Sequence, residues 1–290
     1  HKGHFWAIRR NIAYALMVLF FALPLLRVGG YPSVFFDLAT RRTHLFGTTF
    51  HPTENLVLLA FGFGVVVTVF FVGSTFGRVW CGFGCPQTVY LEFLFRPIEA
   101  WVEGGPAGQR SLNREPWSPR KIRLKTLKWT LFGLVSLVMA ANFVAYFTDW
   151  TVLVPGVLHA PSAWTTPIFT ILFVGGAILF NFGWFRDQMC TIACPYGRLQ
   201  NVLSDKDTLL VAYDTLRGEP RTRTRELAPG IGACVDCNAC VTACPTGVDI
   251  RRGLQVECIG TAQCVDACDE VMRKLGRPTG LIKFTSEREQ

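Results

Sequence analysis

Four long stretches of the chain contain no charged residue, and this pattern limits the possible fold more than any other feature. The stretches are residues 11–26, 56–76, 129–147 and 164–184. About 20 helical residues at ~1.5 Å each cross the ~30 Å apolar core of a bilayer. Half of the 290 residues are apolar and 17% are charged, which argues against buried helices of a soluble protein. We therefore predict a mainly α, polytopic membrane domain with about four spans, of which the first is shortened by Pro24.

Basic residues predict the orientation of these spans. The loop 148–163 contains no Lys or Arg, whereas the segment between the second and third spans is strongly basic. Its basic residues are Arg78, Arg96, Arg110, Arg114, Arg120, Lys121, Arg123, Lys125 and Lys128. By the positive-inside rule the N-terminus, this segment and everything after Trp184 are cytoplasmic, with Arg41 and Arg42 as the one exception. The net charge of +8 thus reflects membrane topology and predicts no nucleic-acid partner.

The composition becomes polar from about Phe185 onward. We divide the chain into a membrane domain at 1–217, an exposed linker at 218–230 rich in Gly, Pro and charge, and a small cytoplasmic cysteine-rich domain at 231–290. A weak internal repeat is also present, because C-x3-C-P follows both the second and the fourth span.

The cysteine-rich domain contains the cluster-binding run of bacterial ferredoxins. Cys234, Cys237, Cys240 and Cys244 form C-x2-C-x2-C-x3-C-P, in which three thiolates bind one cluster and the fourth binds another. Zinc is the alternative, but its C-x2-C pairs are usually a dozen or more residues apart. Disulfides are disfavoured in a reducing cytoplasm. The pattern predicts an α+β ferredoxin-like fold with a 4Fe-4S cluster on Cys234, Cys237, Cys240 and Cys268.

The second cluster motif lacks one cysteine. Cys258, Cys264 and Cys268 keep the spacing, but Thr261 stands at the remaining position. The second site therefore has Cys244, Cys258 and Cys264 as its only thiolates. Three interpretations remain: a 3Fe-4S cluster, a 4Fe-4S cluster with water or another oxygen ligand, and an empty site.

Two further cysteine pairs lie at the predicted cytoplasmic edge of the membrane. Cys81 and Cys85 lie in "CGFGCP", and Cys190 and Cys194 lie in "CTIACP". Each proline favours the first turn of a helix. A helix N-terminus and the nearby residues Arg78, Arg186 and Arg198 are expected to lower the thiol pKa values.

These four thiols have several possible roles. They could form one four-thiolate site for copper, zinc or an iron–sulfur cluster, with Met189 as an additional soft ligand, or act as two redox dithiols. Small buried residues without chemistry are the alternative. We take the four as the candidate catalytic and metal-binding residues. The segment after Cys85 reads as an amphipathic interfacial helix with Val89, Phe93, Leu94, Ile98 and Trp101 on or near one face.

The positions of the histidines argue against a membrane protein that binds haem within the bilayer. All five histidines, His1, His4, His44, His51 and His159, lie outside the predicted spans, so no pair offers axial ligands to an intramembrane haem. His44 and His51 flank "LFGTTF", which we expect to be a solvated loop rather than a metal site.

Taken together, the motifs resemble the CcoG family, also called FixG or RdxA, of cytochrome c oxidase accessory proteins. The resemblance covers nearly the whole chain and rests on long segments including "GRVWCGFGCPQTVYLE", "WFRDQMCTIACPYGRLQNVL" and "CVDCNACVTACPTGVDIRRGLQVECIG". Members usually have cysteine at the position of Thr261, and usually continue into another span and a periplasmic domain.

The resemblance implies an iron–sulfur electron-transfer protein of the bacterial inner membrane. It would take electrons from a cytoplasmic donor and reduce Cu(II) to Cu(I) for the copper centre of a cbb-type oxidase, with copper-delivery or oxidase-assembly proteins as partners. Two alternatives are a quinol-linked membrane redox relay of NapH type and a non-catalytic assembly scaffold.

Overall fold

A computed structural model describes residues 3–38, 40–51, 55–203, 205–223, 230–253, 255–286 and 288. Part of the predicted linker, residues 224–229, lies outside the described residues. The chain divides into two compact units, which are described separately. The first contains His1–Ala13, Val65–Val89 and Asp187–Gln290, and the second contains Tyr14–Gly64 and Tyr90–Arg186.

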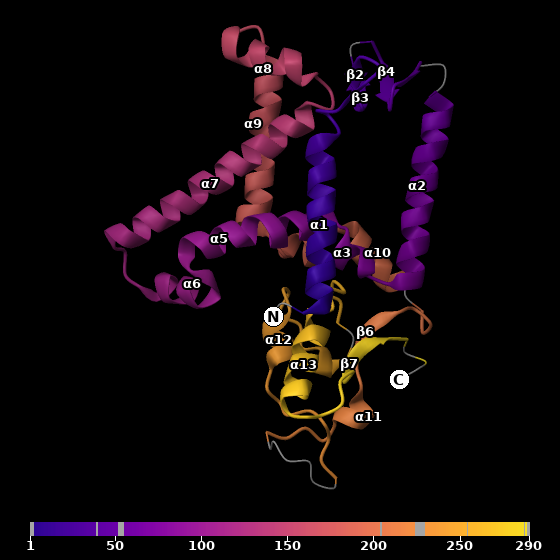
Figure 1. Ribbon diagram of the computed structural model, residues 1–290, viewed down its shortest axis with the longest axis vertical. Coiled ribbons are helices and arrows are strands. Elements are labelled where there is room, and N and C mark those ends of the chain that lie inside the picture. The colour runs from indigo at the N-terminus through magenta and orange to yellow at the C-terminus, as the bar shows by residue number, and fades with distance from the viewer. Residues whose placement is uncertain are drawn as a thin grey trace. The chain divides into compact units, whose positions relative to one another are not determined.

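Four helices in the described part of the chain are long and apolar enough to cross a membrane (Figure 1). They are α1 (His4–Ala22), α2 (Asn55–Phe76), α7 (Pro119–Val144) and α9 (Thr165–Phe180), the last continued by the π-helical segment η3 (Asn181–Phe185). The four predicted spans are thus confirmed as helices. The first begins earlier than predicted, so His4 belongs to its helix, and it ends before Pro24. The helix α7 also begins earlier, at Pro119, where the Ser118 hydroxyl accepts from the Lys121 amide at 3.2 Å as an N-cap.

Short strands connect α1 and α2 within the second unit. The strands β1 (Arg27–Val28) and β2 (Tyr31–Pro32) pair antiparallel, as do β3 (Val34–Asp37), β4 (Arg42–Leu45) and β5 (Thr48–Phe50) in a separate sheet. The prediction of a solvated loop at "LFGTTF" is wrong. Phe46 and Gly47 both adopt positive φ, which makes a two-residue hairpin turn.

His44 is buried in this three-stranded sheet. Its Nδ1 lies 2.9 Å from the Thr49 hydroxyl, and its ring stacks on Tyr31 with centroids 4.0 Å apart. Packing and hydrogen bonding account for His44 without a metal. The predicted loop 148–163 also differs from expectation, because it contains the short apolar helix α8 (Trp150–His159).

The segment after Cys85 is helical, as predicted. It contains α4 (Pro86–Tyr90), the π-helical segment η2 (Leu91–Phe95) and α5 (Arg96–Glu103), and α6 (Gly105–Arg114) follows. Val89 and Phe93 are buried as expected, but Trp101 is 77% exposed. The buried side of α5 presents Glu99 and Glu103, so the interfacial placement of the predicted apolar face stays a prediction.

These two buried carboxylates belong to an ion-pair network in the second unit. Lys128 Nζ of α7 lies 3.1 Å from Glu99 and 2.9 Å from Glu103, and Lys125 Nζ lies 2.8 Å from Glu103. Arg186 donates to both Glu99 oxygens, at 2.9 and 3.1 Å. Burial favours the neutral form of Glu99, but the hydrogen bonds and charges of Arg186 and Lys128 outweigh it and lower its pKa.

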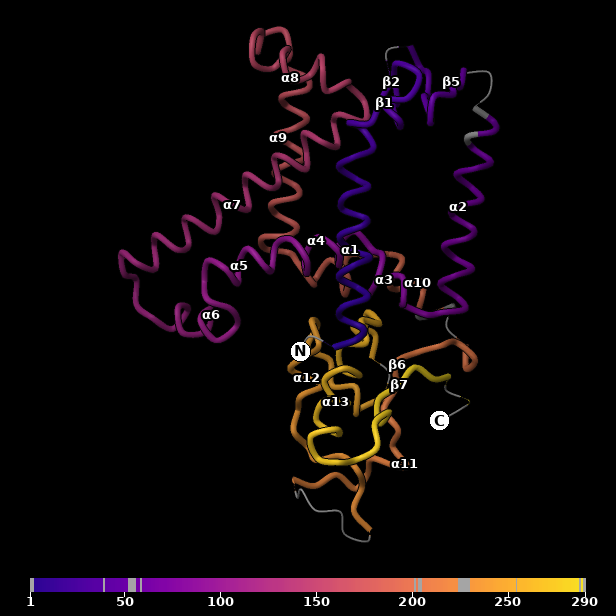
Figure 2. Tube along the Cα trace, viewed as in Figure 1, coloured from indigo at the N-terminus to yellow at the C-terminus, as the bar shows by residue number. Residues whose placement is uncertain are grey.

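The ferredoxin-like fold lies within the first unit (Figure 2). After α10 (Pro195–Leu203) come β6 (Leu210–Tyr213), α11 (Thr215–Gly218), α12 (Ala239–Ala243), the 3₁₀ turn η5 (Ile250–Arg252), α13 (Gln263–Lys274) and β7 (Ile282–Thr285). Because β6 pairs antiparallel with β7, the strand ahead of the predicted linker is part of this fold. The division at 217 and 231 itself stays a prediction.

The first turn of α1 packs directly on the ferredoxin-like fold. The backbone amides of Phe5 and Trp6 donate to the two carboxylate oxygens of Asp266 on α13, at 3.2 and 3.0 Å. The Phe5 ring meets Phe284 of β7 edge to face, with centroids 5.5 Å apart. A carboxylate at these amides satisfies donors that the helix leaves free and complements its dipole.

Candidate functional site

The four thiols predicted to bind the first cluster line one cavity. Cys234, Cys237, Cys240 and Cys268 surround a small cavity of about 20 Å³. Cys240 lies in α12 and Cys268 lies in α13, so the packing of these two helices brings distant parts of the sequence together. The four cysteines of the predicted crossed set therefore line one cavity, and their binding of one cluster stays a prediction.

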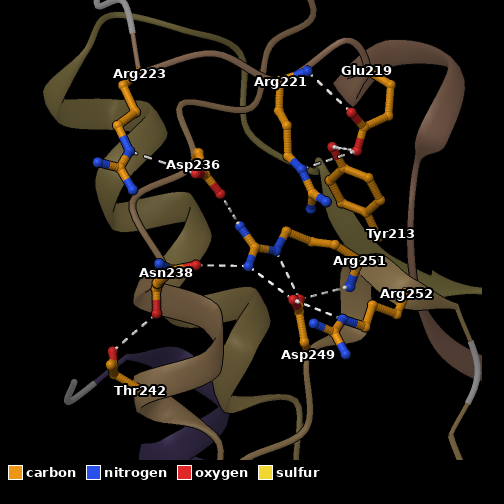
Figure 3. A network of polar contacts seen from close by, with 10 residues as sticks. All are labelled: Tyr213, Glu219, Arg221, Arg223, Asp236, Asn238, Thr242, Asp249, Arg251 and Arg252. Atoms are coloured by element: carbon orange, nitrogen blue, oxygen red, sulfur yellow. Dashed lines mark hydrogen bonds and ion pairs between the residues drawn. The ribbon is translucent and has the colours of Figure 1, made fainter.

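Arg251 lies at the edge of the first cavity and holds its loop in place. Its guanidinium donates to Asp249 at 2.7 and 2.9 Å, to Asp236 at 2.6 Å and to Asn238 at 2.6 Å (Figure 3). Asp236 and Asn238 stand between the cysteines in the left-handed conformation, which Asp and Asn tolerate better than most residues. The sequence analysis missed Arg251, because only the folded loop brings it beside Cys240.

The three remaining ferredoxin cysteines line a second cavity. Cys244, Cys258 and Cys264 surround a small cavity of about 10 Å³. Thr261, 6% exposed, lines the same hollow at the position where the motif would carry a fourth cysteine. The rest of the lining is apolar, namely Val211, Val248, Ile250, Ile259 and Ala262.

Burial raises the thiol pKa values around both cavities. The pKa of Cys268 is raised to about 12, first by burial and then by the neighbouring Cys240. The pKa values of Cys258 and Cys264 are raised mainly by burial. Clustered buried thiols of this kind become thiolates when a metal centre supplies the compensating positive charge.

The arrangement fits clusters better than single ions. Among the described residues, no three His, Cys, Asp or Glu side chains are arranged to bind one metal ion. Thiolates on one zinc all lie about 2.3 Å from the same atom, whereas those of a cluster bind separate irons around a larger body. The separated thiols that line the two cavities match the second case better than the first.

The membrane-edge cysteines occupy equivalent places in two short helical motifs. Cys81 lies in α3 (Val79–Phe83), and Cys85 directly precedes α4, which begins at Pro86. Cys190 lies in the π-helical segment η4 (Met189–Ala193), and Cys194 directly precedes α10, which begins at Pro195. The predicted proline-started helices are therefore present after both motifs.

These four thiols lie within electrostatic reach of one another, and all are partly buried. Burial is the main effect that raises the pKa of Cys81 to about 12, and the charges of Cys85, Cys190 and Cys194 raise it further. Burial likewise raises the pKa of Cys190 to about 12, with Cys85 next. The prediction of lowered pKa values is wrong for Cys81, Cys85 and Cys190, because desolvation is the largest effect at each of them and exceeds that of nearby arginine.

The other residues expected near these thiols have different surroundings. Arg186 belongs to the second unit and pairs with Glu99. Arg198 is exposed. Met189 is half-buried, and its role as a thioether ligand stays a prediction. Binding one ion would require the four thiols to come closer together, since no three of them are arranged for it as they stand.

Two glycines bring the first thiol pair against the second cavity. A Cβ built on Gly82, between Cys81 and Cys85, would lie 2.7 Å from the Gly260 carbonyl oxygen and 2.9 Å from that of Ile259. Gly260 has a φ of +66°, and a Cβ there would lie 2.9 Å from the Arg78 carbonyl oxygen. Two backbones thus meet without intervening side chains, between the "CGFGC" loop and the loop that carries Cys258 and Thr261.

Arg9 of α1 stabilises the same junction. Its side chain is fully buried, and its Nε donates to the Gly82 carbonyl at 2.7 Å. In sequence Arg9 reads only as a flanking charge of the first span, so its role was not predicted.

Comparison with known proteins identifies both cysteine-bearing regions. A family model described as a 4Fe-4S dicluster domain matches residues 185–287, and one described as a 4Fe-4S binding domain matches residues 56–125. The first match covers all the ferredoxin cysteines together with Cys190 and Cys194, and the second covers Cys81 and Cys85. No solved structure matches the chain significantly.

Curated relatives match along most of the chain. Protein RdxA of Cereibacter sphaeroides is 41% identical over a region that covers 87% of this chain and 53% of RdxA. Protein RdxB of the same organism is 39% identical over a region that covers 99% of this chain and 62% of RdxB. Nitrogen fixation protein FixG of Rhizobium meliloti is 39% identical over a region that covers 88% of this chain and 49% of FixG. The chain therefore spans roughly half to three-fifths of the length of these relatives. On this evidence the chain belongs to the FixG/RdxA/CcoG family, with 4Fe-4S ferredoxin-type domains and four helices able to span a membrane.

Proposed function

We propose that this protein carries electrons from a cytoplasmic donor, through its ferredoxin-type sites, to the four membrane-edge thiols, and that Cu(II) is reduced to Cu(I) there. One observation carries the proposal: the loop around Gly82, between two of these thiols, packs backbone to backbone on Ile259 and Gly260 of the second cavity. A route from cavity to thiols then needs no large movement. Copper is the substrate of this reaction, and the product would serve assembly of a cbb-type oxidase through copper-delivery or oxidase-assembly partners.

The residues have separate roles in this proposal. Cys234, Cys237, Cys240 and Cys268 would bind a 4Fe-4S cluster, and Cys244, Cys258 and Cys264 would bind the second. Bound clusters supply one-electron carriage at potentials set by charge, hydrogen bonds and exposure. The chain buries both sites, orients the thiols and keeps the second site beside the membrane-edge loop. Cys81, Cys85, Cys190 and Cys194 would bind copper, because soft thiolates favour Cu(I).

For the second cavity we propose a 3Fe-4S cluster. Thr261 offers no thiolate, and its neighbours Val248, Ile250 and Ile259 line the hollow with apolar surface. A water ligand needs two to four polar partners to be stable, and apart from the Thr261 hydroxyl and the three thiols this lining is apolar.

We further propose that the ferredoxin-like fold faces the cytoplasm of a bacterial inner membrane. The basic segment after α2 and the charge-free loop 148–163 support this orientation. A reducing cytoplasm also suits eleven cysteines that pair in no disulfide in the structure.

Copper reduction can be tested with the purified full chain under anaerobic conditions. Protein reduced with dithionite and then desalted receives Cu(II) in the presence of a Cu(I)-specific chelator. We expect Cys81→Ser and Cys190→Ser to abolish Cu(I) formation while iron content stays normal, and Thr191→Ser, beside Cys190, to retain it. Unchanged Cu(I) formation in both cysteine variants would refute the proposal.

A quinol-linked relay is the second candidate, and one specific feature favours it. An apolar hollow of about 540 Å³ lies beside Cys194, lined by Phe70, Pro195, Tyr196, Arg198, Leu199 and Val202. The Tyr196 hydroxyl is buried and has no hydrogen-bond partner among the described residues. An apolar ligand with a hydroxyl or carbonyl, such as a quinol, suits this lining.

The two candidates are separated by a copper-free measurement. Reduction of the clusters by a short-chain quinol, lost in Leu199→Trp but kept in the exposed control Leu216→Trp, would favour the relay. Absence of reduction by quinol in the wild type would exclude it.

A further inference from the structure

A single buried arginine bridges the second cavity and the membrane-edge cysteine motifs. Arg78 lies between the end of α2 and the start of α3, and it is 7% exposed. Its Nη1 donates to the carbonyls of Val256 and Cys258, the latter at 3.3 Å, and its Nη2 donates to the carbonyl of Gly197. All of these residues belong to the first unit.

The acceptors of Arg78 come from two functionally different loops. Val256 and Cys258 lie on the loop that supplies a thiol to the second cavity. Gly197 lies in the first turn of α10, three residues after Cys194. The backbone of Arg78 itself approaches Gly260, as described above. The residue therefore fixes the cavity loop, the second thiol motif and the start of the first thiol motif against one another.

The buried charge of Arg78 also lies beside both groups of thiols. Its guanidinium donates to the backbone carbonyl of Cys258, which supplies a thiol to the second cavity, and Arg78 stands three residues before Cys81 in the first thiol motif. The first cavity is lined by a different cation, Arg251. The two arginines thus serve different cysteine groups.

We propose that Arg78 is a positioning residue for electron transfer between the second cluster site and the four-thiol centre. This inference rests on the proposed function. Its hydrogen bonds keep the two sites at one fixed separation, and its positive charge stabilises the added electron at either site. One electron from a low-potential donor reaches the second site, passes to the four-thiol centre and converts one Cu(II) to one Cu(I). Because Arg78 donates to carbonyls of both loops, its removal is expected to affect both sites at once.

Two substitutions separate the charge of Arg78 from its hydrogen bonds. Arg78→Gln removes the charge, so we expect the ratio of reduced to oxidised second cluster at a fixed potential to fall about tenfold, a shift of about 59 mV for a one-electron couple. Arg78→Lys keeps the charge but offers no planar fork for several carbonyls at once. It should leave the cluster potential close to that of the wild type and slow the single-turnover oxidation of the second cluster by Cu(II).

The measurement is an EPR-monitored redox titration of the full chain, with iron content determined for each variant. Arg251→Gln is the matched control, for which we expect a shift of the first cluster and not of the second. Equal shifts of both clusters in Arg78→Gln, or no shift of the second, would overturn the inference. Loss of the second cluster's iron in both Arg78 variants would also overturn it, because Arg78 would then be only structural. The titration needs no copper, so a wild type that fails to reduce Cu(II) would refute the proposed function and still leave the potential shift measurable.

Discussion

Adding one methyl group at Gly82 is expected to separate the thiol loop from the second cavity. The new Cβ would lie 2.7 Å from the Gly260 oxygen, and 2.9 Å from both the Gly260 carbon and the Ile259 oxygen. All three are backbone atoms, so no side chain can rotate to make room. Overpacking of this kind costs about 1–3 kcal/mol, and replacing a helical glycine by alanine returns at most about 1 kcal/mol. We expect Gly82→Ala to destabilise the junction by about 1–2 kcal/mol.

Hydrogen exchange in the full chain measures this effect locally. A loss of about 1.4 kcal/mol corresponds to a tenfold increase in exchange of the amides near 256–262, if these open as a unit. The single-turnover rate of Cu(II) reduction should fall at the same time. Gly176→Ala in α9 is the matched control, because nothing lies within 4 Å of a Cβ there. Unchanged exchange and an unchanged rate in Gly82→Ala would refute the argument that backbone contact connects the two sites.

Further predictions concern the buried ion pairs and the second cavity. Glu99→Gln leaves Arg186 without its buried carboxylate and Lys128 with Glu103 alone, and it should lower the unfolding free energy of the second unit by about 3 kcal/mol. Glu270→Gln, in an exposed pair, should change nothing measurable by denaturant unfolding. The pKa of Glu99 is lowered in the folded state. The contribution of Glu99 to stability is therefore fully present above its ordinary pKa of about 4.3 and is lost as the pH falls through the lowered value. A pH titration of the unfolding free energy should show this loss in the wild type and not in Glu99→Gln. Thr261→Cys completes the second motif and should replace the EPR signal of an oxidised three-iron cluster with that of a reduced 4Fe-4S cluster. A wild type without a three-iron signal under oxidising conditions would contradict that account.

The spans and the cluster sites could be predicted because each depends on local pattern. A stretch such as 164–184 has one favourable structure in lipid, since every backbone group must be paired within the segment. The spacing of Cys234, Cys237 and Cys240 likewise fixes three thiols on one short loop, and Cys268 joins them around the cavity as the crossed motif predicts. The helices that begin at Pro86 and Pro195 also follow from local preference.

Features that depend on distant segments were missed or predicted with the wrong sign. The thiol pKa values were expected to fall because helix dipoles and arginines are visible in sequence, but burial is not, and it is the larger effect at Cys81. Glu99 reads as a solvated charge until the fold places Lys128 and Arg186 beside it. The contact of Gly82 with Gly260 joins residues far apart in the chain, and no periodicity in the sequence indicates it.

The most direct test of the central claim is a single-turnover mixing experiment with the anaerobic, fully reduced full chain. Cluster oxidation is followed by absorbance while Cu(I) formation is followed with a chelator. We predict that both signals change at the same rate and with one electron lost per Cu(I) formed. In the variant with Cys81, Cys85, Cys190 and Cys194 all replaced by serine, the clusters should stay reduced on the same timescale. Cu(I) formation without cluster oxidation in the wild type, or cluster oxidation at the wild-type rate in the quadruple variant, would contradict the account.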